Sequence, residues 1–225
     1  EPRKKKLLLA DMDSTIIEEE SLDEIAKFVG LNDEIKKITE DAMNGLINFE
    51  EAIQKRVFLL KNLPYKFVEN FLTKINFSDG SIELIKFMRS HNSKTVLISG
   101  SFLPIIKYVS KKLKFHFFHG NDFIYKKNNN GQTILSGQVK MPILNKNTKL
   151  DFLKRYRSKF NLSNNDIIAV GDGANDIKMI QESGIGVSYK GKAILEKMSD
   201  VNFNHTNLKG ILYLQGYDEQ LINNS

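Results

Sequence analysis

The chain contains no cysteine among its 225 residues, which excludes disulfide bonds and thiolate metal sites. Its four histidines do not show the i, i+4 spacing of metal ligands on a helix. No apolar run approaches the ~18 residues that a membrane span needs. The basic start EPRKKK is followed by only four apolar residues before two aspartates, so we expect no signal peptide. We therefore expect a cytoplasmic protein without membrane contact.

Basic residues exceed acidic ones, and the net charge of +6 raises the question of nucleic-acid binding. Outside EPRKKK the lysines are spread along the chain and mixed with glutamate and aspartate. Such a spread is typical of a solvated surface, and it can also steer an anionic small molecule to a site. We therefore expect a small-molecule substrate and no nucleic acid, and the sequence carries no signal for an oligomeric state.

A short apolar run, Leu7–Ala10, leads directly into Asp11 and Asp13. This pattern predicts a fully buried strand of a parallel sheet that ends in two carboxylates. Ligands of open α/β sheets lie beyond the carboxyl ends of the strands. Two carboxylates this close repel each other unless a cation or a shared proton compensates. Taken alone, the stretch is equally consistent with a strand followed by an acidic turn.

A second acidic cluster, GDGAND, follows DIIAV, residues 166–170, in which four apolar residues come after Asp166. The run predicts another buried strand that delivers Asp172 to the same sheet edge, with Asn175 and Asp176 at the start of a helix. An ordinary strand-to-helix turn capped by aspartate is the alternative. If the two strands are neighbours, their aspartates converge into the oxygen-rich site that Mg²⁺ prefers.

Between these clusters, the sequence ISGSF places Ser99, Gly100 and Ser101 at the end of a third predicted strand, where a helix should begin. A hydroxyl and backbone N–H groups at a helix N-terminus can bind an anion. Lys149, near the start of the predicted helix 146–160, could supply a cation. Separately, a capping serine and a surface lysine are the ordinary interpretation. Together with the aspartates, these residues indicate phosphoryl transfer through an aspartyl phosphate.

Residues 17–77 show the pattern of four short amphipathic helices, which we interpret as a small bundle inserted into the chain. Ser21 with Glu24 predicts a capping box for the first helix, and Asn48 with Glu51 a weaker cap for the third.

Strands and helices alternate from about residue 78 onward, which favours an α/β fold with a doubly wound, mostly parallel sheet. The segment 122–139 predicts a β-hairpin with a turn at NNNGQ. We therefore expect a Rossmann-like core from residues 1–16 and 78–225, with a helical cap from residues 17–77.

With these motifs the sequence resembles the haloacid dehalogenase-like phosphatases, and among them the branch that acts on phosphoserine. The resemblance covers about residues 7–217. It is carried by DMDST (11–15), EESLDE (19–24), AMNG (42–45), NFEEAIQKRVFLLKNLP (48–64), SG (99–100), Lys149 and GDGAND (171–176).

The resemblance implies that Asp11 is the nucleophile and becomes phosphorylated. Asp13 would protonate the departing serine oxygen and then deprotonate the water that hydrolyses the aspartyl phosphate. Mg²⁺ would be bound by Asp11, the backbone carbonyl of Asp13 and Asp172, with Asp176 supporting the metal or the lysine.

The resemblance also implies the substrate contacts. The groups that hold the phosphate would be Ser99, the Gly100 amide, Lys149 and Asn175. On the cap, Glu20 and Arg56 would bind the substrate's ammonium and carboxylate, with Met43 and Phe49 as apolar walls. Arginine suits a carboxylate because it can bind it bidentately. If the cap does not fold over the site, these two are an ordinary surface glutamate and helix arginine.

One position departs from the family, which usually reads SGGF where this chain has SGSF. If position 101 needs a positive φ, Ser101 costs roughly 1 kcal/mol relative to glycine.

The function implied is Mg²⁺-dependent hydrolysis of O-phospho-L-serine, the last step of serine biosynthesis. Transfer of the phosphoryl group to another hydroxyl, such as that of homoserine, would use the same intermediate. Another small phosphomonoester is the substrate if the cap does not recognise the amino acid. A non-catalytic basic binding protein is the alternative from a different class, and it has no use for the aspartates and Lys149.

Overall fold

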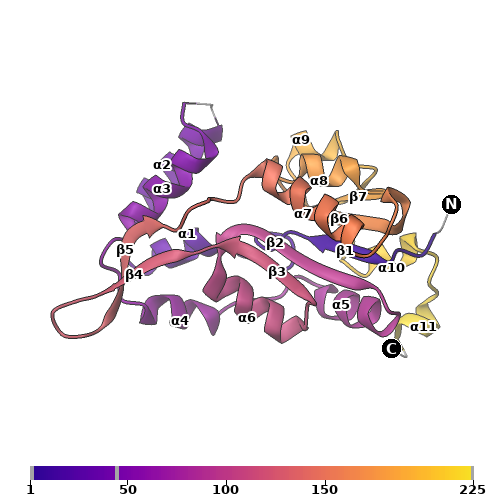
Figure 1. The fold of residues 1–225 in the computed structure, drawn as a ribbon, viewed down its shortest axis with the longest axis horizontal. Coiled ribbons are helices and arrows are strands. Elements are labelled where there is room, and N and C mark those ends of the chain that lie inside the picture. The colour runs from indigo at the N-terminus through magenta and orange to yellow at the C-terminus, as the bar shows by residue number, and fades with distance from the viewer. Residues whose placement is uncertain (1–2, 44–45, 224–225) are drawn as a thin grey trace.

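A six-stranded parallel sheet forms the centre of the protein in a computed structural model that describes residues 3–43 and 46–223, without the side chains of Met43 and Lys146 (Figure 1). The strands, in order across the sheet, are β3 (Phe117–Asn121), β2 (Lys94–Phe102), β1 (Leu7–Ala10), β6 (Ile167–Gly171), β7 (Ile185–Tyr189) and β8 (Val201–Phe203). The short apolar run at the start of the chain is therefore a central strand, as predicted.

Alternate residues of β1 pack on opposite faces of the sheet. Leu8 and Ala10 belong to one apolar cluster, while Leu7 and Leu9 belong to another. This follows from the two-residue period of a strand, and it explains why the run is apolar throughout.

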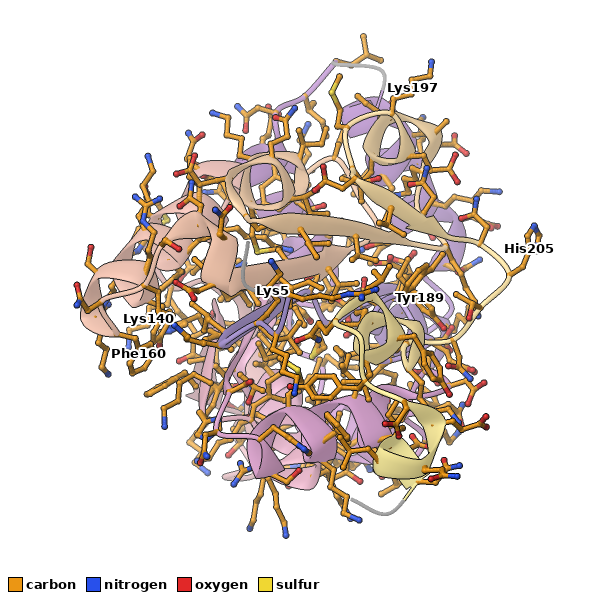
Figure 2. The ribbon with its side chains drawn as sticks, turned by 90° about the vertical axis from the view of Figure 1, so that its right-hand side faces the viewer. Lys5, Lys140, Phe160, Tyr189, Lys197 and His205 are labelled. Carbon is orange, nitrogen blue, oxygen red and sulfur yellow. The ribbon has the colours of Figure 1, made fainter. Side chains whose placement is uncertain are left out.

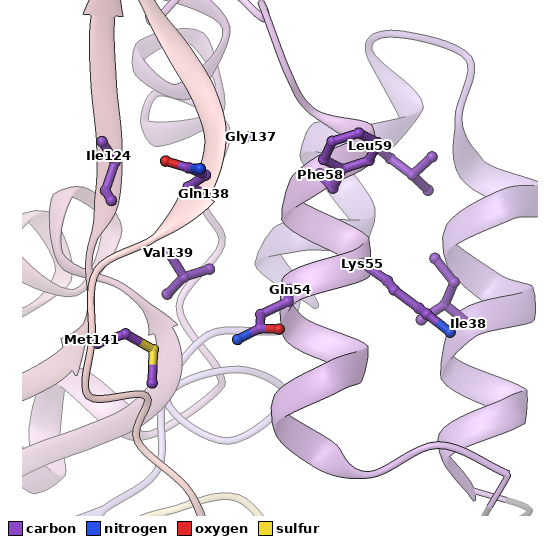
Figure 3. A pocket seen from close by; sticks show the side chains of 10 residues that line it. All are labelled: Ile38, Gln54, Lys55, Phe58, Leu59, Ile124, Gly137, Gln138, Val139 and Met141. Carbon is purple, nitrogen blue, oxygen red and sulfur yellow. The ribbon is translucent and has the colours of Figure 1, made fainter.

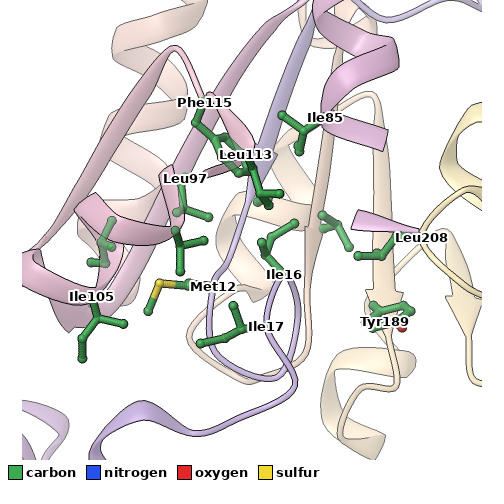
Figure 4. Close-up of a cluster of buried hydrophobic side chains, with 14 of the residues drawn as sticks. Met12, Ile16, Ile17, Ile85, Leu97, Ile105, Leu113, Phe115, Tyr189 and Leu208 are labelled. Carbon is green, nitrogen blue, oxygen red and sulfur yellow. The ribbon is translucent and has the colours of Figure 1, made fainter. Parts of the chain in front are cut away.

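Helices cover both faces, so the sheet is doubly wound (Figure 1). One face carries α5 (Ser81–Ser90), α6 (Leu103–Leu113) and α10 (Gly210–Leu214), and α11 (Glu219–Asn223) follows nearby. The other face carries α7 (Lys146–Lys159), α8 (Ile177–Glu182) and α9 (Ala193–Glu196), with the 3₁₀ turn η1 (Asn164–Asp166) leading into β6. The larger apolar cluster continues beyond β1 through Met12, Ile16 and Ile17 (Figure 4), which fixes the loop that follows the strand.

The predicted bundle is present between β1 and α5. Its helices are α1 (Ser21–Lys27), α2 (Asn32–Met43), α3 (Phe49–Leu59) and α4 (Lys66–Leu72). An isolated bridge between Ile17 and Phe77 joins the two ends of the insertion. The division into a cap of residues 17–77 and a core stays a prediction.

The predicted hairpin is also present, as antiparallel strands β4 (Phe123–Lys127) and β5 (Thr133–Val139). It lies beside the bundle rather than in the main sheet (Figure 1). Backbone hydrogen bonds of 2.9 Å join Leu135 to Asn62 and Leu63, and thus tie the hairpin to the segment after α3.

Two local predictions at helix starts are wrong. Ser21 does not cap α1, because the N-cap residue is Glu20 and the Ser21 hydroxyl donates to Asp13 instead. Strand β2 continues to Phe102, so Ser101 lies in the strand and not at a helix N-terminus. Its φ is not positive, and the conditional strain at this position is absent. The cap at Asn48 is confirmed, since its side chain accepts from the Glu51 N–H at 2.9 Å.

Basic side chains are distributed around the molecule, and Lys140 and Lys197 lie far apart at its rim (Figure 2). Lys5 is an exception because it is buried, with its Nζ donating to the Asn165 carbonyl at 2.7 Å. Within the described ranges, no helix is both long and apolar enough to cross a membrane.

Candidate active site

The carboxyl ends of three adjacent strands bring the predicted site residues together. Strand β1 pairs with both β2 and β6, so Asp11, Ser99 and Asp172 meet at one edge of the sheet. They line a cavity of about 400 Å³ to which the core and the bundle both contribute. The predicted residues in its lining are Asp11, Asp13, Glu20, Phe49, Arg56, Ser99, Gly100, Asp172 and Asn175. The side chain of Met43 lies outside the described part of the chain.

Lys149 is buried at the base of this site between two aspartates. Its Nζ lies 2.8 Å from Oδ1 of Asp11 and 2.6 Å from Oδ1 of Asp176. The capping box at Asn145 begins α7 one turn earlier and thereby fixes the position of the lysine. Burial disfavours the charged lysine, but the two carboxylates outweigh it and raise its pKa above the ordinary value. Lys149 is therefore a permanent cation next to Asp11.

Asp176 ties the second acidic loop to this lysine. Its Oδ2 accepts from the Gly173 N–H at 3.2 Å, while Oδ1 accepts from Lys149. A Cβ atom at Gly171 would lie 2.4 Å from the Asp176 Cγ, so only glycine fits at the end of β6. Gly171, the first glycine of GDG, thus makes room for the Asp176 carboxylate that binds Lys149.

Carboxylate oxygens of Asp11, Asp172 and Asp176 all lie within 4.8 Å of one another. Burial, and then the charge of Asp176, raise the pKa of Asp11 well above its usual range. The same two causes raise the pKa of Asp172 to about 7. Buried carboxylates at this spacing are compensated by a cation, and their hard oxygens suit a divalent metal. The residues present therefore fit a divalent cation.

Asp13 has a different environment, on the side of the cavity that faces the bundle. Burial, and then the nearby charge of Glu20, raise its pKa to about 8, although Ser21 and Arg56 oppose the shift. A carboxyl group with this pKa carries a proton at neutral pH and can give it to a leaving group. The geometry thus gives the two aspartates different surroundings: Asp11 lies 2.8 Å from the Lys149 ammonium, and Asp13 is suited to carry a proton.

The β2 end of the site is an irregular part of the strand, where its pairing with β3 shifts register between Ile98 and Phe102. The Ser99 hydroxyl accepts from the Ser101 N–H at 3.0 Å, and the Asn121 side chain donates to the Gly100 carbonyl at 2.6 Å. A Cβ atom at Gly100 would lie 3.2 Å from Cζ of Phe49, so the glycine lets the bundle come close. The Ser101 hydroxyl is buried and has no partner within the described residues.

Two opposite charges from the bundle line the same cavity, and each is held by a neighbour. Glu20 accepts from the Ser14 hydroxyl at 2.9 Å. Arg56 donates through Nη2 to Oδ1 of Asp23 at 2.6 Å. A cavity with an anion and a cation beside a phosphoryl-transfer centre suits a zwitterionic phosphate ester.

Two charged residues of the cavity lining were not predicted, Asp23 and Lys192. Asp23 lies one helical turn from Glu20, and this spacing is the signal that could have found it. Lys192 lies in the loop after β7, and its N–H donates to the Asp172 carbonyl at 2.8 Å. Its charge also lowers the pKa of Asp172 against the effect of burial. Nothing local in the sequence marks this lysine, because the contact depends on the pairing of β6 and β7.

A larger cavity, of about 610 Å³, lies between the bundle and the hairpin (Figure 3). Its one charged residue in the described lining is Lys55, which pairs with Glu51 at 2.9 Å. With no carboxylate in that lining, this cavity offers neither a nucleophile nor metal ligands of the kind found at the sheet edge.

Comparisons with known proteins agree with the geometry. A family model described as haloacid dehalogenase-like hydrolase matches residues 8–181. The chain is 36% identical to a probable phosphoserine phosphatase of Schizosaccharomyces pombe, over 96% of this chain and 72% of that protein. It is also 36% identical to the phosphoserine phosphatase of Methanocaldococcus jannaschii, over 93% of this chain and 97% of that one. A substrate-bound phosphoserine phosphatase structure superposes with a TM-score of 0.84 at 36% identity, covering 93% of this chain and 98% of that one.

Proposed function

The chain belongs to the haloacid dehalogenase-like hydrolases, and we propose that within this family it hydrolyses O-phospho-L-serine to L-serine and phosphate, with Mg²⁺ as cofactor. One observation carries the proposal: a single cavity is lined by Asp13, by Asp11 with the buried Lys149 behind it, and by the opposite charges of Glu20 and Arg56. The first group suits phosphoryl transfer, and the second suits an amino acid.

Asp11 and Asp13 have different roles in the reaction. The Asp11 carboxylate attacks phosphorus, and the bond from phosphorus to the serine oxygen breaks while Asp13 gives that oxygen its proton. The ionised Asp13 then takes a proton from water, the water oxygen attacks phosphorus, and phosphate and the free Asp11 carboxylate are released. The pKa of about 8 at Asp13 supports the first role, since the group is protonated before the leaving oxygen needs it.

The remaining core residues bind the phosphate and the metal. Mg²⁺ would be held by Asp11, the backbone carbonyl of Asp13 and Asp172, while Asp176 orients Lys149. When bound, the metal supplies positive charge that offsets the buried carboxylates and the phosphoryl oxygens. The phosphate would be contacted by Ser99, the Gly100 amide and Asn175, which line the cavity, and by Lys149, which lies 2.8 Å from Asp11.

Specificity would come from the bundle, which we propose acts as a cap of residues 17–77 over a core of residues 1–16 and 78–225. Glu20 would bind the substrate ammonium and Arg56 its carboxylate, with Phe49 and Met43 as apolar walls. Closure of such a cap excludes water during transfer to Asp11. The product places the enzyme at the last step of serine biosynthesis, which we expect to take place in the cytoplasm.

The test is phosphate release in Mg²⁺ from O-phospho-L-serine, O-phosphoethanolamine and p-nitrophenyl phosphate, with Asp11→Asn as the inactive control. We expect strong preference for phosphoserine and no release by the variant. Equal rates on all three esters would contradict the amino acid specificity. No release from any of them, together with salt-dependent RNA affinity, would support the binding-protein alternative.

Adding homoserine tests the other acceptor. Transfer to homoserine would yield O-phosphohomoserine in place of inorganic phosphate, and we expect the phosphate yield to be unchanged.

A further inference from the structure

Asp23 is a carboxylate in the catalytic cavity to which the proposed reaction gives no role. It lies on α1, and its Oδ1 is 2.6 Å from Nη2 of Arg56 on α3. The side chain of Asp23 is 34% exposed and that of Arg56 is 17% exposed, so the pair is partly shielded from water. An ion pair at this depth is more than a surface contact, which contributes little.

The pairing leaves part of the guanidinium free. A guanidinium has five N–H donors, and the contact with Asp23 uses the Nη2 nitrogen. Nε of Arg56 is buried and finds no hydrogen-bond partner among the described residues. A buried donor without a partner is unfavourable. Arg56 also lines the cavity, where its N–H groups that do not bind Asp23 can meet an acceptor of a ligand.

The other charges around Arg56 show why it needs a fixed partner. Asp13 and Glu20 also face this part of the cavity, and the charge of Arg56 acts on Asp13. A long arginine among several carboxylates has more than one favourable position. The bond to Asp23 selects one of them before substrate arrives, which reduces the entropy lost on binding.

We infer that Asp23 is a positioning residue: it holds Arg56 in the orientation that receives the carboxylate of the substrate. This inference rests on the proposed function, because it requires that Arg56 binds that carboxylate. It makes Asp23 a determinant of specificity for substrates that carry a carboxylate as well as the phosphate ester, without contact between Asp23 and the phosphate.

The test compares Asp23→Ala with the unaltered enzyme on two substrates, O-phospho-L-serine and O-phosphoethanolamine, which lacks the carboxylate. We expect KM for phosphoserine to rise roughly tenfold, the worth of a hydrogen bond to a charged group, with kcat nearly unchanged. The kcat/KM for phosphoethanolamine should stay within about twofold. Asp23→Glu, which keeps the charge, should recover part of the loss.

Two further variants make the result decisive. In a double-mutant cycle, Asp23→Ala should add little to the loss caused by Arg56→Ala, because it acts through that arginine. Glu24→Ala removes the next carboxylate of α1, which pairs with Lys27 on the surface, and should leave both substrates unaffected.

The inference would be overturned by an equal loss on both substrates, by fully multiplicative losses with Arg56→Ala, or by a lower KM for phosphoserine in Asp23→Ala. The last would mean that Asp23 competes with the substrate for Arg56. If the unaltered enzyme does not hydrolyse phosphoserine, the proposed function fails and the role of Asp23 with it. If it does and Asp23→Ala is indistinguishable from it, only the role of Asp23 fails.

Discussion

Among individual residues, the most tightly interdependent are Lys149 and the two carboxylates it contacts, those of Asp11 and Asp176. All three groups are buried, and charged groups are costly to bury. Removing one member leaves the charge of the others poorly compensated. Asp176 accepts hydrogen bonds from both Lys149 and the Gly173 N–H. Its loss would therefore disturb the lysine on α7 and the loop after β6 at the same time.

We predict that Asp176→Asn lowers the free energy of unfolding by about 3 kcal/mol, as expected for a broken buried pair. It should also lower kcat by about 100-fold, since Lys149 loses the contact that aims it at Asp11. Urea unfolding and steady-state kinetics measure the two effects. Glu182→Gln is the matched control, because its partner Arg157 is partly exposed and such a pair contributes less than about 1 kcal/mol. Similar losses in both variants would contradict the account.

At this scale the sequence predicts the groups that follow strands and misses those that act through tertiary contacts. Asp11 and Asp172 are predictable because each ends an apolar run. The bond between Asp23 and Arg56 joins residues 33 positions apart, and no local pattern encodes it. Ser21 is misread for the same reason, since its hydroxyl is drawn to Asp13 rather than to the helix backbone.

At the scale of elements, η1 and the start of β6 depend on one carboxylate. Asp166 accepts from the N–H and the hydroxyl of Ser163, and it pairs with Lys6 at 2.9 Å next to β1. The bond from Lys6, and then the bonds from Ser163, lower the pKa of Asp166 to about 2. This carboxylate joins the turn before β6 to the neighbouring strand.

The sign of the pH effect follows from that lowered pKa. The stabilising contribution of Asp166 is complete above its ordinary pKa of 3.8, and it is lost as the pH falls through about 2. We predict that Asp166→Asn destabilises the protein at neutral pH and that the difference from the unaltered protein shrinks as the pH falls over this window. Denaturant unfolding across the acid range measures it. A difference that is constant with pH would show that the charge of Asp166 has no part in the effect.

Strand and helix limits are only partly encoded locally. The Asn48 cap is predicted correctly because its partner, Glu51, is three residues away. The end of β2 is misplaced because Gly100 interrupts the apolar run, whereas pairing with Asn121 of β3 extends the strand to Phe102. Neighbouring strands, rather than the segment itself, decide such limits.

At the scale of the whole molecule, the alternation of strands and helices predicts the doubly wound sheet, and four amphipathic helices predict the bundle. Local sequence patterns do not predict that the bundle and the sheet edge share one cavity, which only the family resemblance implies, because the shared cavity depends on contacts such as Phe49 with Gly100 and Glu50 with Asn145. These patterns also do not predict that the hairpin pairs with the segment around Pro64.

We predict that a divalent cation bound by the acidic cluster in the shared cavity stabilises the whole fold. Mg²⁺ at about 100 times its Kd should raise the free energy of unfolding by about 2.7 kcal/mol, because it binds only the folded acidic cluster. Thermal unfolding with Mg²⁺ or with EDTA measures the shift. Asp172→Asn should abolish most of it, while Asp200→Asn, outside the cluster, should preserve it. An equal Mg²⁺ effect in the Asp172 variant would place the ion elsewhere.

The most direct test of the central claim is to trap the phosphorylated enzyme. The enzyme is mixed with O-phospho-L-serine and Mg²⁺, quenched in acid within the first turnover, and mapped by peptide mass spectrometry. We expect a hydroxylamine-sensitive phosphoryl group on the peptide that contains Asp11, absent from Asp11→Asn. A phosphoryl group on another residue, or phosphate release by Asp11→Asn at the normal rate, would contradict it.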